Sequence, residues 1–576
     1  MKSLFPYMKA FRKEIVLSPL FKLLEAIFEL FIPLVVASII DVGIAQNNTA
    51  YMLKCCGIML LLGIIGLVCA VSAQFFAARA AVGFSSKVKQ SLFDHIQKFS
   101  YTDLDTLGTS SLVTNMTSDI NQVQTGVNLV LRLFLRSPVI VFGAMIMAFT
   151  IDAKSAVPFV ILIPALSVVV FGIMLITIPL YKKVQQRLDK LLGITRENLN
   201  GVRVIRAFNR REAEVEAFQE ANSALNAIQV FSGKISALMN PLTFVLVNGA
   251  IIALLYTGAI RVDTGIITQG ELIALCNYMS QILVELVKLA NLIITVTKAV
   301  ACGHRIGKVL EKVPETNAVP IDSERIDAHA LCFSNVSMTY KNAGAESLTD
   351  VSFYIDHGQT LGLIGSTGSG KSTLVNLIPR FYHATRGSIS VDGKNIEHYS
   401  EEELRDKIGI VAQKSVLFKG SVRSNLQWGN SNADEATLTE ALKTAQAYDF
   451  IMEKPNGIDA TVEAGGKNFS GGQRQRLCIA RALAKRPEIL ILDDSSSALD
   501  YATDAALRKA IRALPYQPTT VIVSQRTASI MHADKIVVLD DGEMVGVGTH
   551  DELLNTCPVY QEIYQSQFFE NGGEAK

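Results

Sequence analysis

One glycine-rich segment of the sequence could bind phosphate. Residues 365–372 read Gly-Ser-Thr-Gly-Ser-Gly-Lys-Ser; they follow the apolar run 360–364 and precede a helical pattern over residues 373–378. In this setting glycines let backbone N–H groups converge on phosphate oxygens, the lysine adds positive charge, and the serine can ligate magnesium. We therefore expect a nucleotide with Mg²⁺ here. The candidate binding residues are Gly365, Ser366, Thr367, Gly368, Ser369, Gly370, Lys371, Ser372 and Thr373.

A second segment could help to hold the metal. Residues 489–493 read Ile-Leu-Ile-Leu-Asp, which is typical of a buried strand that ends in an acid. Ligands of parallel sheets bind at the carboxyl ends of the strands, so Asp493 is predicted to orient Mg²⁺ together with Ser372. Many buried strands end in aspartate, and the assignment depends on the glycine-rich loop that accompanies it.

A third segment is the most specific. Residues 468–475 read Asn-Phe-Ser-Gly-Gly-Gln-Arg-Gln and resemble the signature motif of ATP-binding cassettes, which other phosphate-loop ATPases lack. A serine hydroxyl and glycine N–H groups that open a helix can form a second cradle for a γ-phosphate. The candidate residues are Ser470, Gly471, Gly472 and Gln473. A simple glycine turn before a helix would leave the two neighbouring motifs unexplained.

These motifs require a sheet to position them. Short apolar runs at 360–364, 408–411, 489–492 and 520–523 alternate with helical segments, which indicates an α/β domain with a largely parallel sheet. We assign this nucleotide-binding domain to residues 330–576. Residues 311–329 contain prolines and polar residues and are predicted to be a linker.

The first half of the chain is predicted to cross a membrane. Hydrophobic residues make up 49% of the chain and charged residues 19%, and the mean hydropathy is +0.30, which is too apolar for an ordinary soluble enzyme. Each apolar run reaches the roughly 20 residues that a helix needs to span a bilayer. The runs are 15–40, 52–84, 129–151, 156–181, 237–259 and 272–300. Residues 1–310 are therefore predicted to form a six-helix transmembrane domain.

Charge sets the expected orientation and excludes one class of partner. Lysines and arginines concentrate after the second and fourth apolar runs, so these connections and both termini are predicted to be cytoplasmic, in a multi-pass protein of the plasma membrane. The helices should extend below the bilayer. The breaks at 103–112 and 200–208 are candidate contacts with a cytoplasmic domain, although plain helix-turn-helix connections explain them equally well. The net charge of +1 argues against nucleic acid.

With these motifs in order, the whole chain resembles a subunit of the bacterial heterodimeric multidrug-type ABC exporters. The resemblance implies that Tyr340 stacks on adenine, that Gln413 links the magnesium site to the membrane domain, and that Asp500 contacts an opposing cassette. It also implies that two cassettes close face to face, with each ATP between the phosphate loop of one and the signature of the other. The breaks at 103–112 and 200–208 would then be coupling helices that rest on the cassettes. The implied cargo is an amphipathic, drug-like small molecule.

Two positions depart from the family pattern. Asp494 stands where the family usually has a glutamate that polarises water, and Gln525 stands where it usually has a histidine that contacts the γ-phosphate. The loss of two such groups should slow hydrolysis by about 10²-fold or more. Because the signature is intact, the chain could still complete a partner's active site. We therefore expect a heterodimer with a second half-transporter and asymmetric ATP sites. A third position also departs from the pattern. The family's glutamate that contacts the coupling helices is displaced to Glu463 here, so whether this contact forms is an open question.

Two alternatives remain open on the sequence. A regulatory subunit could sense nucleotide without powering transport, as Asp494 and Gln525 would permit. A homodimeric exporter of lipid, peptide or porphyrin could use Asp494 as its base. An importer is disfavoured because the membrane domain is fused ahead of the cassette.

Charged residues within the apolar runs could line a substrate cavity. The candidates are Glu25, Glu29, Arg132 and Arg136. Such charges are costly in a bilayer unless they face a cavity or a partner. The acids could contact a cationic substrate and the arginines an anionic one. Alternatively, these residues form structural pairs with one another or with Lys22, and the charge pattern does not choose between these interpretations.

Overall fold

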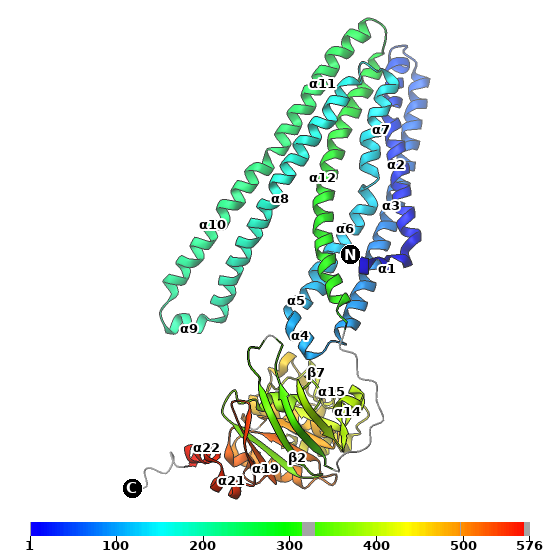
Figure 1. The fold of residues 1–576 in the computed structure, drawn as a ribbon. Helices are drawn as coiled ribbons and strands as arrows, with labels where there is room; N and C mark the ends of the chain where they lie inside the picture. Colours follow the sequence, from blue (N-terminus) through cyan, green and yellow to red (C-terminus); the bar gives the residue numbers. More distant parts are fainter. Residues whose placement is uncertain (1, 314–328, 342, 496, 569–576) are drawn as a thin grey trace. The chain divides into compact units, whose positions relative to one another are not determined.

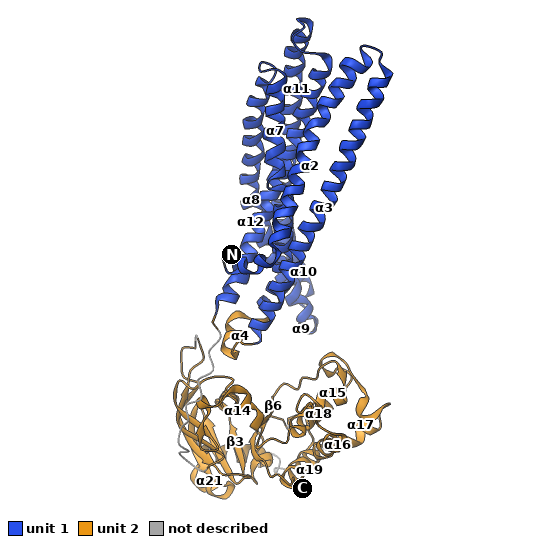
Figure 2. Ribbon diagram, turned by 90° about the vertical axis from the view of Figure 1, so that its right-hand side faces the viewer, with its two compact units in different colours: residues 1–97, 110–312 blue, residues 98–109, 313–576 orange. Residues whose placement is uncertain are grey.

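The computed structural model describes residues 2–313, 329–341, 343–495 and 497–568, which form two compact units. Unit 1 comprises residues 1–97 and 110–312, and unit 2 comprises residues 98–109 and 313–576 (Figure 2). Most of the predicted linker lies outside the described residues. The short segment Lys98–Thr109 groups with unit 2, although it falls within the range predicted for the membrane domain.

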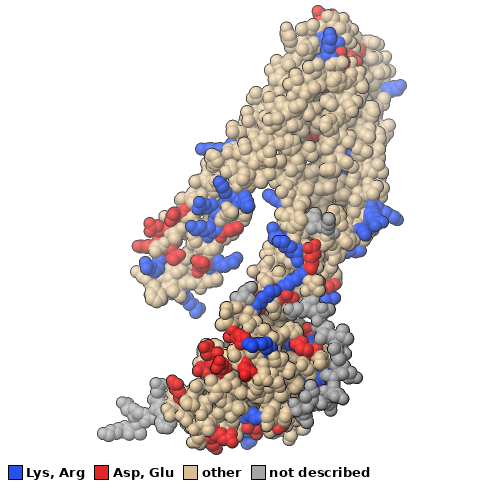
Figure 3. Space-filling model, in the orientation of Figure 1, with Lys and Arg blue, Asp and Glu red and all other residues tan. Residues whose placement is uncertain are grey.

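Unit 1 contains six helical stretches that are long and apolar enough to cross a membrane. They are Phe5–Ile44, Thr49–Ile96, Thr109–Ile151, Val157–Asn200, Arg211–Asp263 and Gln269–Glu311. Each predicted apolar run coincides with part of one of them, which confirms the six-helix domain. Their lengths of 40 to 53 residues exceed the roughly 20 that a crossing requires. On the face in Figure 3, charged side chains are sparse over the long middle portion of unit 1.

The stretches are built from helices with few interruptions. The helices are α1 (Phe5–Met8), α2 (Arg12–Ser38), α3 (Thr49–Ile96), α4 (Tyr101–Leu107), α5 (Thr109–Thr114), α6 (Ile120–Leu133), α7 (Arg136–Ile151), α8 (Val157–Asn200), α9 (Val202–Ala207), α10 (Arg211–Ala237), α11 (Met239–Asp263) and α12 (Gln269–Glu311). The break between α6 and α7 precedes Pro138, which lacks the N–H that a continuous helix would use. This break places Arg136 at the start of a new helix.

The core of unit 1 gathers side chains from α2, α7, α8, α11 and α12. Tyr278 of α12 is fully buried there, and its hydroxyl donates to the carbonyl of Leu30 on α2 at 2.5 Å. In Figure 1, α8 and the α10–α11 stretch form an antiparallel pair, joined by α9, which diverges from the other helices toward α9. The pair is therefore packed into the bundle mainly at the end opposite to α9.

Unit 2 is built on a ten-stranded sheet in the order β5-β4-β1-β2-β12-β11-β3-β10-β9-β6. The strands are β1 (Leu331–Met338), β2 (Leu348–Ile355), β3 (Thr360–Gly365), β4 (Arg386–Val391), β5 (Lys394–Asn395), β6 (Ile408–Val411), β9 (Ile489–Asp493), β10 (Thr519–Val523), β11 (Lys535–Asp540) and β12 (Glu543–Gly548), and a separate hairpin pairs β7 (Gly420–Ser421) with β8 (Thr461–Val462). The four predicted strands lie in β3, β6, β9 and β10. Strands β11, β3, β10, β9 and β6 pair parallel, and one further parallel pairing joins β12 to β2. The sheet is mixed, because β11 pairs antiparallel with β12 and β1 pairs antiparallel with both β2 and β4.

Helices cover the sheet and complete two hydrophobic clusters. They are α13 (Lys371–Leu377), α14 (Glu401–Lys407), α15 (Val422–Leu426), α16 (Glu435–Thr444), α17 (Tyr448–Met452), α18 (Gly471–Ala484), α19 (Tyr501–Arg512), α20 (Thr527–Ile530), α21 (His550–Thr556) and α22 (Pro558–Phe568). Along β9, Leu490 and Leu492 join one cluster, and Ile489 and Ile491 join the other. Successive side chains of a strand point to opposite faces, so β9 is buried on both sides, and this explains its continuous apolar sequence.

Candidate functional site

A cavity of about 480 Å³ lies at the carboxyl ends of β3, β9 and β10 in unit 2. It brings together ten of the predicted site residues: Thr367, Gly368, Gly370, Lys371, Ser372, Thr373, Gln413, Asp493, Asp494 and Gln525. Its volume is in the usual range for small-molecule sites, roughly 300–1,000 Å³. The phosphate loop, the acids at the end of β9 and Gln525, which are separated in the sequence, therefore meet in one place.

The glycine-rich loop depends on its glycines for shape. Gly370 has a φ of +92°, a left-handed conformation that side-chain-bearing residues rarely adopt, and a Cβ there would lie 2.7 Å from the carbonyl oxygen of Ser347. Lys371 follows at the start of α13, and its Nζ donates to the carbonyls of Gly365 at 2.9 Å and Ser366 at 2.5 Å and to Ser369 Oγ at 3.2 Å. The ammonium group is thus held within the loop, where phosphate oxygens can replace these acceptors.

Burial shifts the pKa values of Lys371 and Asp493. Desolvation lowers the pKa of Lys371, although Asp494 and Asp493 act to raise it. Desolvation also raises the pKa of Asp493, against a hydrogen bond from Ser372 that acts to lower it. Both charged forms are therefore costly when the cavity holds only protein groups, and a bound ion of opposite charge would stabilise each of them.

The residues fit Mg²⁺ with a nucleotide. Ser372 Oγ donates to Asp493 Oδ1 at 3.2 Å, and the amide of Gln413 lines the same cavity. Hydroxyl, carboxylate and amide oxygens are the hard ligands that Mg²⁺ accepts beside phosphate oxygens and water, and such sites need only one or two carboxylates.

Asp494 is fixed by its backbone. Its φ is +47°, a conformation that aspartate adopts more readily than most residues. Its N–H donates to the carbonyl of Val523 at 3.1 Å, and its carbonyl accepts from Ser497 Oγ at 2.9 Å and Gln475 Nε2 at 3.3 Å. The side chain lines the cavity beside Asp493, where an acid could act on a water molecule.

Gln525 is positioned by a residue that belongs to none of the predicted motifs. Gln567 on α22 accepts from the N–H of Thr527 at 2.8 Å and donates to the carbonyl of Gln525 at 2.7 Å. The side-chain amide of Gln567 therefore holds the backbone of the loop at Gln525 and Thr527 through two hydrogen bonds. Nothing in the sequence marks this residue, since it lies 42 positions after Gln525 and in no motif. Glu346 and Asp541, which also line the cavity, were missed for the same reason.

Four candidate residues contribute to the loop without lining the cavity. The peptide oxygens of Gly365 and Ser366 and the hydroxyl of Ser369 accept from Lys371. Tyr340 donates from its hydroxyl to Thr373 Oγ1 at 3.1 Å and packs edge-on against Tyr382, with ring centroids 5.1 Å apart. Stacking of Tyr340 on adenine stays a prediction.

The signature residues lie outside this cavity. Ser470 caps α18: its hydroxyl accepts from the N–H of Gln473, and the Gln473 side chain accepts from the N–H of Ser470. A Cβ on Gly472 would lie 2.9 Å from the carbonyl of Ala498, so glycine is needed where α18 packs against the segment before α19. Asp500 caps α19 through the N–H of Thr503 at 2.8 Å. These residues form a second, separate surface.

The segment Lys98–Thr109 packs against Phe381 and Tyr382, which follow α13 in the same unit. Tyr101 stacks on Phe381, with ring centroids 4.5 Å apart, and Tyr382 donates to Asp105 Oδ2 at 2.7 Å. Burial, together with this hydrogen bond, raises the pKa of Tyr382. Phe381 and Tyr382 follow α13, so a movement of this segment can reach the loop. Within unit 1, by contrast, Phe208 after α9 is 75% exposed.

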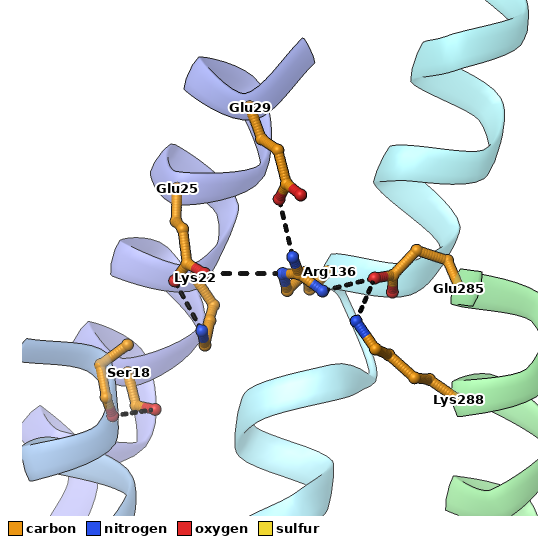
Figure 4. Close-up of polar contacts among 8 residues, drawn as sticks. Ser18, Lys22, Glu25, Glu29, Arg136, Glu285 and Lys288 are labelled. Carbon is orange, nitrogen blue, oxygen red and sulfur yellow. Dashed lines mark hydrogen bonds and ion pairs between the residues drawn. The ribbon is translucent and has the colours of Figure 1, made fainter. Parts of the chain in front are cut away.

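The charged residues of unit 1 form a network (Figure 4). Arg136 on α7 donates to Glu285 Oε1 on α12 at 2.6 Å and to Glu29 Oε2 on α2 at 2.7 Å, and its Nε lies 3.7 Å from Glu25 Oε1. Lys22 pairs with Glu25 at 2.6 Å, and Lys288 pairs with Glu285 at 2.8 Å.

Arg136 and Glu285 are 8% and 3% exposed, so the centre of the network is buried, whereas Glu29 and Lys288 are partly exposed. Three cations thus balance three carboxylates. These contacts favour the structural interpretation for Arg136, Glu25 and Glu29, and Arg132 forms no ion pair with the described residues.

Lys371→Met is expected to weaken ATP binding by about 10- to 100-fold, the effect of losing a hydrogen bond to a charged group. The fold should survive, since burial already disfavours the charged lysine. The affinity for a fluorescent ATP analogue measures the effect. Lys414→Met is the control, because Lys414 follows Gln413 but does not line the cavity. Equal ATP affinities of Lys371→Met and Lys414→Met would show that Lys371 does not contribute to ATP binding.

Comparison with known proteins identifies both parts of the chain. Residues 15–286 match the family model of the ABC transporter transmembrane region, and residues 348–497 match the ABC transporter model. An uncharacterised ABC transporter ATP-binding protein of Bacillus subtilis, YfiB, is 36% identical over 553 residues, which is 96% of each chain.

Other relatives have more specific names. The putative multidrug export ATP-binding/permease protein YgaD of Bacillus subtilis is 31% identical over 98% of this chain and 99% of its own. The ATP-dependent lipid A-core flippase of Syntrophus aciditrophicus is 31% identical over 84% and 80%. The structure of a bacterial Atm1-family ABC exporter with ATP bound superposes with a TM-score of 0.80 over 97% of this chain and 98% of that one, at 24% identity, and thus shares the fold.

Proposed function

The chain belongs to the ABC transporter family as an ATP-driven exporter half-transporter, and we propose that it is the subunit of a heterodimer that carries the weakened ATP site. In this proposal its own phosphate loop binds ATP with Mg²⁺ and hydrolyses it slowly. Its signature completes the active site of the partner. The protein is a multi-pass membrane protein, and we place it in the plasma membrane with both termini in the cytoplasm, on the distribution of lysine and arginine.

The observation that carries the proposal is the pairing of Asp494 with Gln525 in one cavity. Asp494 is one methylene shorter than the glutamate that usually polarises water in this family. Gln525 is a neutral amide where a histidine usually donates to the γ-phosphate. A single preorganised donor is often worth about 10²-fold in rate, so the two changes together predict a slow site.

The signature surface supports the second half of the proposal. Ser470 and Gln473 cap each other, so the start of α18 is ordered, and the first N–H groups of a helix have no partner within the helix itself. Gly471 is exposed, and a Cβ at this position would have no atom nearer than 4.0 Å. An intact anion cradle that lies outside its own chain's ATP cavity is suited to the γ-phosphate bound by another subunit.

Transport would then follow alternating access. ATP binding closes two cassettes, and the segment around Tyr101 and Asp105, together with the exposed end at α9, carries the motion to the membrane helices. Hydrolysis at the partner's site resets the exporter. The role of α9 is proposed from family resemblance and from the exposure of Phe208.

The cargo is proposed to be an amphipathic, drug-like small molecule. The relative named as a putative multidrug exporter supports this class, and the relative named as a lipid A-core flippase supports lipid as a second candidate. Peptide and porphyrin stay open. Because Arg136 is already paired with carboxylates, an anionic cargo would have to displace a protein ligand from it, which disfavours that class.

The experiment compares the ATPase activity of the purified chain alone with that of the chain co-expressed with its genomic neighbour. We expect the chain alone to be nearly inactive, the pair to be active, and that activity to survive Asp494→Asn. The reason is that the partner supplies the productive glutamate and histidine. The equivalent substitution of the partner's glutamate should abolish turnover.

A matched control is available in the same cavity. Asp541 also lines it and also has a positive φ, +45°, so Asp541→Asn makes the same chemical change in the same backbone conformation. If the chain alone hydrolyses ATP, and Asp494→Asn but not Asp541→Asn abolishes this activity, then Asp494 is a working base and the homodimer is correct. If the pair binds ATP but transports nothing in vesicles, the regulatory alternative is favoured.

A further inference from the structure

A groove lies between α8 and α11, at the end of unit 1 where the helices meet the connections 152–156 and 264–268. Its volume is about 520 Å³, comparable to small-molecule sites. Its lining is apolar except at Lys154 and Thr257. The apolar lining residues are Val157, Pro158, Ile161, Leu162, Ala165, Val245, Leu246, Gly249, Ala250 and Ala253.

Small side chains keep the groove open. Gly249 and Ala253 are four residues apart and so lie on one face of α11, and Ala165 is among the lining residues of α8. A Cβ on Gly249 would meet no atom within 4 Å. The groove is therefore space that side chains of unit 1 leave unfilled.

A groove of this kind in a bilayer attracts hydrocarbon. Ile161 and Val245 are 66% and 70% exposed, so the lining continues onto the surface of unit 1. Leaving the space empty would forfeit dispersion contacts, and an acyl chain of the surrounding lipid can supply them. From Val157 to Ala165, α8 rises by about 12 Å, a length along which a chain can lie.

One end of the groove carries an unneutralised cation. Lys154 is exposed and forms no ion pair with the described residues, whereas Arg261 at the same end is paired with Asp152 at 2.5 Å. The hydroxyl of Thr257 donates to the carbonyl of Ala253 at 2.9 Å and is therefore satisfied. Lys154 is thus the lining group that is available to an anion.

We propose that this groove binds an anionic phospholipid, with one acyl chain along Gly249 and Ala253 and the phosphate beside Lys154. This bound lipid is distinct from the transported cargo, and the assignment does not depend on the heterodimer. The lipid would occupy the space between α8 and α11 and so stiffen the helix pair that diverges from the bundle.

The test uses the transporter as purified, reconstituted in nanodiscs of dioleoyl phosphatidylglycerol and dioleoyl phosphatidylcholine in equal amounts. Retained lipids are counted by native mass spectrometry after release into detergent. We expect phosphatidylglycerol to be retained over phosphatidylcholine by about five-fold, the effect of one lysine near an anionic headgroup. Gly249→Leu fills the groove and should remove this retained lipid. Lys154→Gln should remove the preference while leaving lipid bound.

The matched control is Gly63→Leu on α3. Gly63 is also exposed, and a Cβ there also meets nothing within 4 Å, so the substitution adds the same apolar surface away from the groove. Equal lipid retention by Gly249→Leu and Gly63→Leu would overturn the proposal, as would a phosphatidylglycerol preference that persists in Lys154→Gln. Efficient cross-linking of Val245→Cys to a partner subunit would show that protein covers the groove, and would overturn it too.

Discussion

Gly471→Asp should reduce the ATPase activity of the active transporter by at least about 10²-fold while the chain still folds. The substitution places a carboxylate at the first position of α18, on the surface proposed to hold the γ-phosphate of the partner's site. Two anions cannot share this position. Steady-state ATPase activity of the reconstituted pair measures the loss, and the thermal midpoint of the same sample reports on the fold.

The fold should tolerate this change for two reasons. The nearest atom to a Cβ on Gly471 is the Cβ of Ala498 at 4.0 Å, which is ordinary contact. An acidic residue in the first turn of a helix is also favourable to the helix dipole. Gly471→Ala is the control, since it adds the same Cβ without charge and should retain most activity. Full activity in Gly471→Asp would mean that this signature completes no productive site.

Gly472 is not a suitable substitute in this experiment. A Cβ there would lie 2.9 Å from the carbonyl of Ala498, so any side chain would displace the segment that precedes Asp500. A loss of activity at that position would combine a packing defect with a defect in phosphate binding. Packing thus requires glycine at position 472, whereas position 471 has room for a side chain and tests the effect of charge.

Arg136→Met is expected to destabilise the membrane domain by about 3–5 kcal/mol. Arg136 pairs with Glu285, Glu29 and Glu25, which come from α12 and α2, and its removal leaves Glu285 buried with Lys288 as its one remaining cation among the described residues. The network then holds three carboxylates and only two cations, Lys22 and Lys288, and a buried charge without its counter-ion costs far more than the loss of a surface pair. The thermal midpoint in detergent and the yield of folded protein measure the effect.

Arg132→Met provides the comparison for this prediction. Arg132 lies on α6, four residues before Arg136, and forms no ion pair with the described residues. Its loss should therefore change the thermal midpoint little. The double variant Arg136→Met with Glu285→Gln should recover part of the stability, because it removes the most buried of the three carboxylate charges. If Arg136→Met is as stable as Arg132→Met but changes transport, the cluster belongs to cargo binding and the structural interpretation is wrong.

Much of the architecture was predictable from the sequence. The six membrane helices were predicted correctly because a bilayer demands about 20 apolar residues for each crossing, and such a run is visible without knowledge of its neighbours. Strands β3, β6, β9 and β10 were predicted because parallel strands buried on both faces are apolar throughout. The antiparallel strands β2, β4 and β12 were not predicted, since their pairing depends on register with partners and leaves mixed sequences.

The sequence by itself determined which residues could bind phosphate and magnesium, because these motifs are defined by the spacing of a few neighbouring residues. The phosphate loop, the acid that ends β9 and the signature serine are each recognisable because each motif lies within a few consecutive residues. Asp494 and Gln525 are recognisable for the same reason, as departures at defined positions within those motifs. Tertiary structure brought them into one cavity with Gln413, and it added Glu346, Asp541 and Gln567, which belong to no motif.

The ion-pair partners of the membrane charges are defined only by the tertiary structure. From the sequence, Glu29 and Arg136 could belong to a substrate site or to structural pairs, since charge type alone fits both. The partners of Arg136 lie 107 residues earlier, at Glu29, and 149 residues later, at Glu285. The stability of a buried ion depends on the distance to its counter-ion and on the dielectric around the pair, and both are set by how the helices pack.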